Sequence, residues 1–145
     1  MEQSPGTQLA RLLLAGFDAM VNEATAELAR RGHPGVTAPL EFALQAVDEG
    51  ADSAAELGRR LGISRQGAAK AIASLTQLGY LGSAPDPADA RRKRLHVTAR
   101  GYEMTAIGRD AFDAARRRWA ASLEPGRAEQ VEDALRRLAP GNTGA

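Results

Sequence analysis

The chain has 145 residues, no cysteine and a formal net charge of +1. This length fits one domain with its own hydrophobic core, and the lack of cysteine excludes disulfides, thiol redox switches and thiolate metal sites. Positive charge is concentrated in residues 51–100, where nine Lys and Arg stand against four acids, an asymmetry typical of a nucleic-acid footprint.

Apolar residues recur at helical spacing from Leu9 to Leu28, which predicts a long first helix that ends at Gly32 and Pro34. A second helix is predicted after Thr37, whose side chain can cap it. The predicted inner face of this second helix is Leu40, Ala43, Leu44 and Val47.

The next segment predicts a helix-turn-helix. Ser53 and Glu56 have the spacing of a capping box, in which each side chain bonds the other residue's amide. The short helix that they begin ends at Gly62, and Ser64 can cap a second helix that ends before Gly79. Its predicted inner face is Ala68, Ala69, Ile72 and Leu75.

Two short strands are predicted next, at Tyr80–Ala84 and Leu95–Thr98, joined by a loop that begins at Pro85. Thr98 can cap a long helix, and a break at Pro125 separates it from a last helix. The apolar stripe predicted for the long helix is Tyr102, Thr105, Phe112, Ala115, Trp119 and Leu123, and that for the last helix is Ala128, Val131, Leu135 and Leu138. Residues 140–145 are expected to form a frayed tail.

These elements predict an all-α fold with a small β-hairpin wing. We expect one domain over residues 1–145, with a DNA-binding lobe at about 36–98 between helices at about 7–32 and 99–139. The long apolar stripes of the flanking helices have no other obvious partner in the chain. They therefore predict a homodimer.

The second helix of a helix-turn-helix usually enters the major groove with its N-terminal residues at the base edges. Arg65 and Gln66 have the hydrogen-bonding geometry to read guanine and adenine, while Ser64 and the free amides of the first turn suit a phosphate. Lys70 and Ser74 are predicted to follow on the same outward face. Four consecutive basic residues at the second strand suit a wing in the minor groove, with Arg92 and Arg94 on phosphates.

Four runs are similar to the multiple antibiotic resistance regulator (MarR) family: Ala55–Gly67, Leu75–Leu81, Asp86–Arg92 and Leu95–Gly101. The resemblance implies a dimer interlocked through its first and last helices, bound to a roughly palindromic double-stranded operator. It implies that Arg91 enters the minor groove and that Asp89 helps to hold it. It further implies repression that is released by a small organic effector, in a cleft that Phe17, Phe42 and Trp119 are candidates to line.

Other functions find less support in the sequence. No nucleophile elbow, metal-ligand spacing or glycine-rich phosphate loop is present, so we expect neither an enzyme nor a cofactor or metal site. The N-terminus lacks the pattern of a signal peptide and no apolar run would span a bilayer, so we expect a cytoplasmic protein without membrane contact. The remaining alternative is a winged-helix module that binds protein, which would need neither the basic wing nor a polar recognition helix.

Overall fold

The computed structural model describes residues 4–139, and the tail predicted at 140–145 lies outside them. Within this range the chain forms six helices and one two-stranded antiparallel hairpin, which confirms the predicted fold class. The order is α1 Pro5–Arg30, α2 Ala38–Asp48, α3 Ala54–Leu61, α4 Arg65–Gln77, β1 Leu81–Pro85, β2 Lys93–Val97, α5 Ala99–Ala121 and α6 Arg127–Leu138. None of the helices in residues 4–139 is both long and apolar enough to cross a membrane.

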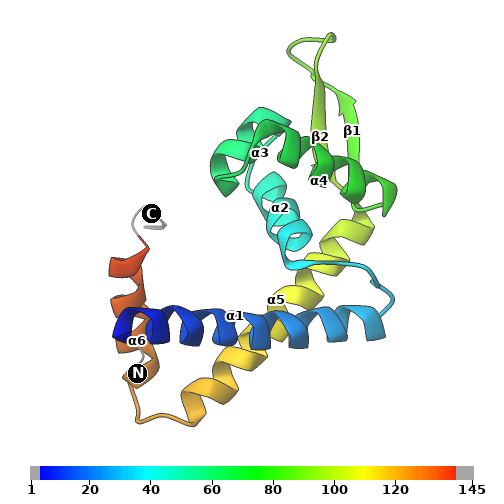
Figure 1. The fold of residues 1–145 in the computed structure, drawn as a ribbon. Coiled ribbons are helices and arrows are strands. Elements are labelled where there is room, and N and C mark those ends of the chain that lie inside the picture. The colour runs from blue at the N-terminus through cyan, green and yellow to red at the C-terminus, as the bar shows by residue number, and fades with distance from the viewer. Residues whose placement is uncertain (1–3, 140–145) are drawn as a thin grey trace.

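The helices divide into a base and a projecting lobe (Figure 1). In the base, α1 packs along α5, and α5 continues through a short turn into α6. The lobe consists of α2, α3, α4 and the hairpin, with α4 packed on both α2 and α3. These elements together are called the lobe, and α1, α5 and α6 the base. The lobe is joined to the base mainly through the contact of α2 and β2 with α5.

One hydrophobic core lies between the lobe helices and the first half of α5. Its fully buried large side chains include Leu28, Leu44, Leu57, Leu75, Tyr80 and Met104. The inner face predicted for the second helix is confirmed, since Ala43, Leu44 and Val47 are buried and Leu40 packs against the core. On the first helix only Ala24 and Leu28 are buried, while the predicted stripe from Leu9 to Phe17 is largely exposed. Burial of apolar surface in this core is the main term that stabilises the lobe.

The predicted helix caps are confirmed. They could be predicted because each cap joins residues only three positions apart. The hydroxyls of Thr37, Ser53, Ser64 and Thr98 each accept a hydrogen bond from the third residue that follows. The second half of the capping box is wrong. The Glu56 carboxylate accepts hydrogen bonds from Arg59 and Arg60 rather than from the Ser53 amide, because two guanidinium groups on the next turn attract it more strongly than a neutral N–H.

The limits predicted for the hairpin need correction. Pro85, expected in the loop, is the last residue of β1 and pairs with Lys93. Proline is tolerated there because it stands at the end of an edge strand, and the next ladder bond runs from the Asp86 amide to the Arg92 carbonyl at 2.8 Å. The second strand therefore begins at Lys93, earlier than predicted.

The apolar faces predicted for α4, α5 and α6 are partly wrong. Ala69 on α4 is exposed, while Ala71 is half-buried against the core. On α5 the buried face is Gly101, Met104, Thr105, Ile107 and Gly108, whereas Tyr102 and Trp119 are 52% and 40% exposed. On α6 only Ala128 is buried, and Leu135 and Leu138 remain exposed. The helical period was right, but the first half of α5 turns toward the lobe, which the sequence pattern does not specify.

Candidate nucleic-acid interface

The turn between α3 and α4 sets the position of α4, the second helix of the helix-turn-helix and the predicted recognition helix. Gly62 adopts the left-handed conformation, with φ of 67°, and the Ile63 amide donates to the Gly58 carbonyl at 3.0 Å. Gly58, which sequence reasoning did not single out, is needed because a Cβ there would lie 2.9 Å from the Ile63 carbonyl oxygen. Two glycines therefore let the start of α4 approach α3 closely.

The N-terminal turn of α4 presents its polar residues to solvent. Ser64, Arg65, Gln66 and Lys70 are all exposed, and neither Arg65 nor Lys70 forms an ion pair with any residue in the range 4–139. The Ser64 hydroxyl accepts the Gly67 amide at 3.0 Å. Ser74, the predicted continuation of this face, is half-buried, and Ala73 beside it is exposed.

The wing tip is held by side chains that bond its own backbone. Asp86 Oδ1 accepts from the Ala88 amide at 2.9 Å, and Asp89 Oδ1 accepts from the Arg91 amide at 3.0 Å. Asp89 therefore fixes the backbone of Arg91 rather than its guanidinium group. These turns leave four basic side chains exposed along the tip and the start of β2: Arg91, Arg92, Lys93 and Arg94.

Arg94 is the one member of this basic run with an acidic neighbour among the described residues. Its Nε lies 3.8 Å from Asp52 Oδ2, just before α3, and both side chains are well exposed. An exposed pair of this kind contributes little stability. It therefore holds the Arg94 side chain only weakly.

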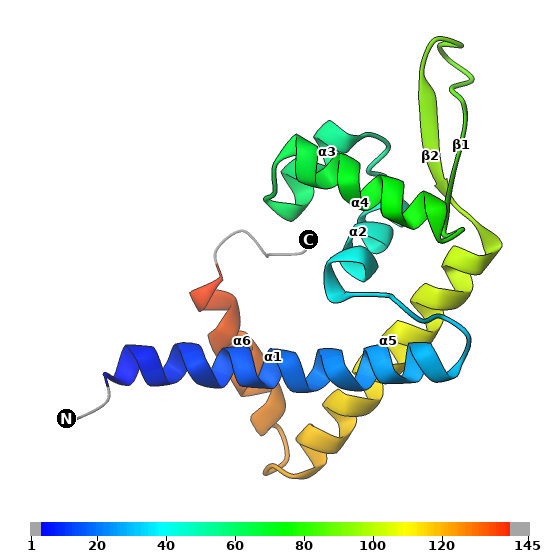
Figure 2. The same cartoon turned by 45° about the vertical axis from the view of Figure 1, so that its right-hand side comes forward.

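The recognition helix and the wing lie at the same end of the molecule. In both views the hairpin and α4 project away from α1 and α6, with the wing tip farthest out (Figures 1 and 2). The exposed cations of α4 and of β2 thus belong to one end of the lobe. The excess positive charge of residues 51–100 is concentrated there.

Arg100 joins the end of α4 to the segment that follows α1, a role that no sequence pattern predicts. Its Nε donates to the Leu78 carbonyl at 3.3 Å and its Nη2 to the Gly32 carbonyl at 3.2 Å. Its guanidinium also lies 5.1 Å from the centre of the Tyr80 ring. Three segments far apart in the sequence therefore converge on one side chain.

His33 completes this junction. It is buried, and its Nδ1 lies 3.0 Å from the Tyr80 hydroxyl. Its Nε2 lies 3.3 Å from Glu103 Oε1 but in a geometry that makes no hydrogen bond. Burial raises the pKa of the Tyr80 hydroxyl, so Tyr80 stays protonated and available as a donor.

Two of the three residues predicted to line an effector cleft do line a cavity. Phe17 and Phe42 stand with ring centres 6.4 Å apart, and Phe42 stacks on Phe112 at the same separation. The cavity they border has a volume of about 400 Å³, lies between α1, α2 and α5, and includes Arg109 in its wall. Trp119 lies outside this cavity. Phe112 and Arg109 were missed as lining residues because their place depends on how α5 docks.

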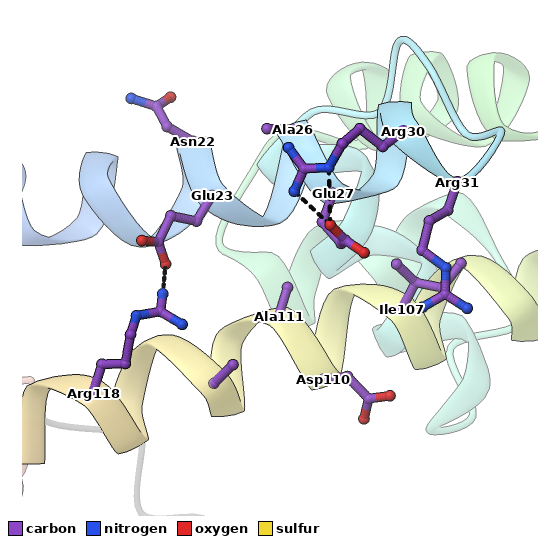
Figure 3. A pocket seen from close by; sticks show the side chains of 11 residues that line it. Asn22, Glu23, Ala26, Glu27, Arg30, Arg31, Ile107, Asp110, Ala111 and Arg118 are labelled. Carbon is purple, nitrogen blue, oxygen red and sulfur yellow. Dashed lines mark hydrogen bonds and ion pairs between the residues drawn. The ribbon is translucent and has the colours of Figure 1, made fainter. Parts of the chain in front are cut away.

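A second hollow, of about 570 Å³, lies between α1 and α5 (Figure 3). Most of its wall is charged, and Arg118 reaches across it from α5 to bond Glu23 of α1, while Arg30 pairs with Glu27 at 3.1 Å on α1 itself. These ion pairs occupy four of the six charged side chains of the wall, and Arg31 and Asp110 belong to neither pair. The hollow therefore belongs to the packing of α1 on α5 more than to a ligand site.

Comparison with known proteins shows which family this chain is similar to. Residues 42–92 match the model of the MarR family. The structure of MarR from E. coli is 18% identical, with a TM-score of 0.68 over 96% of this chain and 100% of that one. The PcaV transcriptional regulator from Streptomyces coelicolor is 23% identical, with a TM-score of 0.71 over 94% of this chain and 96% of that one.

BpsR of Bordetella bronchiseptica, whose DNA binding is regulated by 6-hydroxynicotinic acid, is 19% identical, with a TM-score of 0.70 over 98% of this chain and 100% of that one. A search of curated proteins gave no significant match. The resemblance to the MarR family is therefore confirmed: residues 42–92 match that family, and the fold of the chain is that of its transcriptional regulators.

Proposed function

We propose that the protein is a homodimeric regulator that binds a specific double-stranded DNA operator and represses nearby genes. The observation that carries this proposal is the joint exposure of the α4 N-terminus and the basic wing at one end of the lobe. A module that binds only protein would need neither feature. The function rests on one domain over residues 1–145, with the lobe at about 36–98 between the dimerisation helices.

Reading and positioning are assigned to different elements. Arg65 and Gln66 read base edges in the major groove, where an arginine bonds guanine and a glutamine bonds adenine. Ser64, Lys70 and Ser74 are assigned to the phosphate backbone or the groove wall, with Ser74 the least accessible of them. Arg91, held by the turn at Asp89, enters the minor groove, and Arg92 and Arg94 contact phosphates.

Dimerisation follows from the apolar surface that the base leaves uncovered. Leu9, Leu12 and Leu14 of α1 are 48%, 63% and 60% exposed, and Leu138 of α6 is 54% exposed. Apolar patches of this kind mark interfaces in soluble proteins. A symmetric dimer presents two recognition helices, so its operator is expected to be roughly palindromic.

The cavity beside Phe17, Phe42 and Phe112 is the proposed site of a small organic effector. The three rings supply apolar surface, and Arg109 supplies a cation suited to an aromatic carboxylate. Asp48, Glu49 and Asp113 in the same wall disfavour a second negative charge on the ligand. The regulation of BpsR by an aromatic acid supports an effector of this class. Trp119 is assigned no contact in this cavity.

Selection of bound fragments from genomic DNA, followed by a titration of salt, tests the proposal. If a dimer makes about 6–10 phosphate contacts, the affinity for the selected operator should fall about 10³–10⁵-fold between about 50 and 200 mM salt. A flat response to salt, or no enriched sequence, would favour the protein-binding alternative.

A screen of aromatic acids against free and DNA-bound protein then tests the effector. A true effector weakens operator binding, and the operator must weaken effector binding by the same factor. A compound that binds both forms equally would not be an effector of this protein.

A further inference from the structure

Glu41 is a carboxylic acid buried without a hydrogen-bond partner at the joint between the lobe and the base. It lies in the first turn of α2, its side chain is 1% exposed, and its Oε1 has no hydrogen-bond partner among the described residues. Buried polar atoms are nearly always paired, so an unpaired carboxyl oxygen requires an explanation. The base reading, the wing and the effector cavity make no use of it.

The carboxyl group occupies a notch that only a glycine provides. Gly108 is buried in the middle of α5, and a Cβ at that position would lie 2.7 Å from the Glu41 carboxyl carbon and closer still to Oε1. The absence of a side chain at Gly108 therefore lets α2 carry its acid directly against the α5 backbone. This contact lies in one of the few packing surfaces between the lobe and the long helix of the base.

Burial governs the charge state of Glu41. Loss of hydration raises the pKa of its carboxyl to about 7 from an ordinary value of 4.5, and burial is the sole cause. The N-terminal half of a helix favours an anion only by about 0.3–1 kcal/mol, too little to offset this loss. The carboxyl is thus neutral in slightly acid solution and acquires a buried, unpaired charge in slightly alkaline solution.

Charged groups on the surrounding elements leave Glu41 uncompensated. None of them contributes to its shifted pKa. They include Glu23, Glu27, Arg30 and Arg31 on α1 and in its cap, His33 after it, Asp48 and Glu49 at the far end of α2, Glu56, Arg59 and Arg60 on α3, Arg65 and Lys70 on α4, Lys93, Arg94 and His96 on β2, and Arg100, Glu103, Arg109 and Asp110 on α5.

We propose that the Glu41 carboxyl, seated in the notch at Gly108, is a proton-dependent latch between the lobe and the base. The protonated acid packs against α5 and holds α2 in place. The ionised acid has no partner in the notch, so it leaves for water and α2 separates from α5. The lobe then loses its fixed orientation on the dimer, and operator affinity falls as the pH rises.

Hydrogen exchange of the free, full-length protein tests the latch without reference to DNA. After correction for the intrinsic dependence of exchange on pH, peptides from α2 and from the middle of α5 should open about tenfold more at pH 8 than at pH 6. Linkage gives this factor for a carboxyl that regains an ordinary pKa when exposed. Glu41→Gln, neutral at every pH, should remove the difference, while Glu124→Gln, at an exposed acid between α5 and α6, should keep it.

A second variant guards against a misleading result from Glu41→Gln. Gly108→Ala fills the notch, so α2 and α5 peptides should exchange faster at both pH values and respond less to pH than those of the wild type. The latch is refuted if the wild type shows no corrected change between pH 6 and pH 8, or if Glu41→Gln retains the wild-type change.

The effect on DNA rests on the proposed function and is measured separately. Operator affinity of the wild type should weaken by up to about tenfold from pH 6 to pH 8, while that of Glu41→Gln stays constant. Failure to bind any DNA at either pH would refute the proposed function, and the exchange experiment would still decide the latch. Equal affinities at both pH values in a protein whose α2 opens would refute its regulatory role.

Discussion

At the scale of the residue, the side chains proposed to contact the DNA bases are exposed. Arg65 is exposed at the first position of α4, and in residues 4–139 it makes no ion pair. Arg65→Ala should therefore cost about 1–3 kcal/mol of operator binding and relax preference at one symmetric pair of positions. Affinities measured across a randomised operator library would show this, with thermal melting unchanged.

Arg91→Ala is the matched comparison at the wing. The minor groove carries a degenerate pattern of donors and acceptors, so its loss should weaken binding across many sequences and reduce the dependence on salt. Preference should be lost mainly at flanking A·T-rich steps. If Arg65→Ala left every base preference intact in a folded protein, the first turn of α4 would not be the part that reads the DNA bases. Lys70 would then be the next candidate.

Glu41 gives a prediction for stability. The folded state keeps a proton that the unfolded chain releases above its ordinary pKa of 4.5, so this group lowers the free energy of unfolding as the pH rises from about 4.5 to about 7. The full loss is about 3 kcal/mol above that window. Glu41→Gln should gain stability relative to the wild type across this range, measured by urea unfolding at several pH values. A constant difference between the two proteins from pH 4 to pH 8 would contradict it.

The site residues that the sequence predicts are set by local patterns, whereas those it does not predict depend on contacts between distant segments. Arg65, Gln66 and Arg91 are recognisable because their setting is local: a cap, a short turn and a run of basic residues. Glu41, Gly108 and Arg100 acquire their roles only when α5 docks against segments that lie well away from it in the sequence, between 22 and 68 positions for the two hydrogen bonds of Arg100. Glu41 in particular reads as an ordinary polar residue of an amphipathic helix, and only the partner helix reveals that it is buried.

At the scale of the element, helix starts could be predicted and helix faces only in part. A cap is a hydrogen bond across three residues, so Thr37, Ser64 and Thr98 were identified from sequence alone. Which side of α5 is buried depends on the lobe that packs against its first half. The place of Pro85 also depends on the neighbouring strand. Proline can end β1 because no further strand pairs with it on the other side in the described hairpin.

Thr98 is the cap whose removal should be most informative. Its hydroxyl accepts from the Gly101 amide at 3.1 Å and donates to the Gly79 carbonyl at 2.6 Å, so it joins the start of α5 to the turn after α4. Thr98→Ala should lower the free energy of unfolding by about 1–2 kcal/mol. Thr98→Ser, which keeps the hydroxyl, should lose much less. Equal losses in urea unfolding would show that the methyl group matters rather than the hydrogen bonds.

At the scale of the whole molecule, the base leaves large apolar side chains exposed, and the proposed dimer would cover them. The lobe encloses its core within one chain, whereas the first half of α1 and the end of α6 leave large leucines in water. Burying one leucine side chain contributes about 1.5–3 kcal/mol. These leucines are exposed in a single protomer, so a monomer does not gain this stabilisation. Helical periodicity in the sequence predicts an apolar stripe on each of these helices, and within one protomer most of the large residues of the α1 stripe stay exposed.

Leu12→Glu tests whether a second copy of the chain covers this surface. Leu12 is 63% exposed on α1, so a glutamate should leave the isolated protomer folded. In a symmetric dimer it would remove two leucine contacts and bury two charges, which should raise the dimer dissociation constant at least about 100-fold. Gln77→Glu, which adds the same charge at an exposed position of α4, is the control and should remain dimeric. Sedimentation equilibrium at micromolar concentration distinguishes the two variants. A wild-type chain that sediments as a monomer and binds its operator in that form would refute the dimer, and the expectation of a palindromic operator with it.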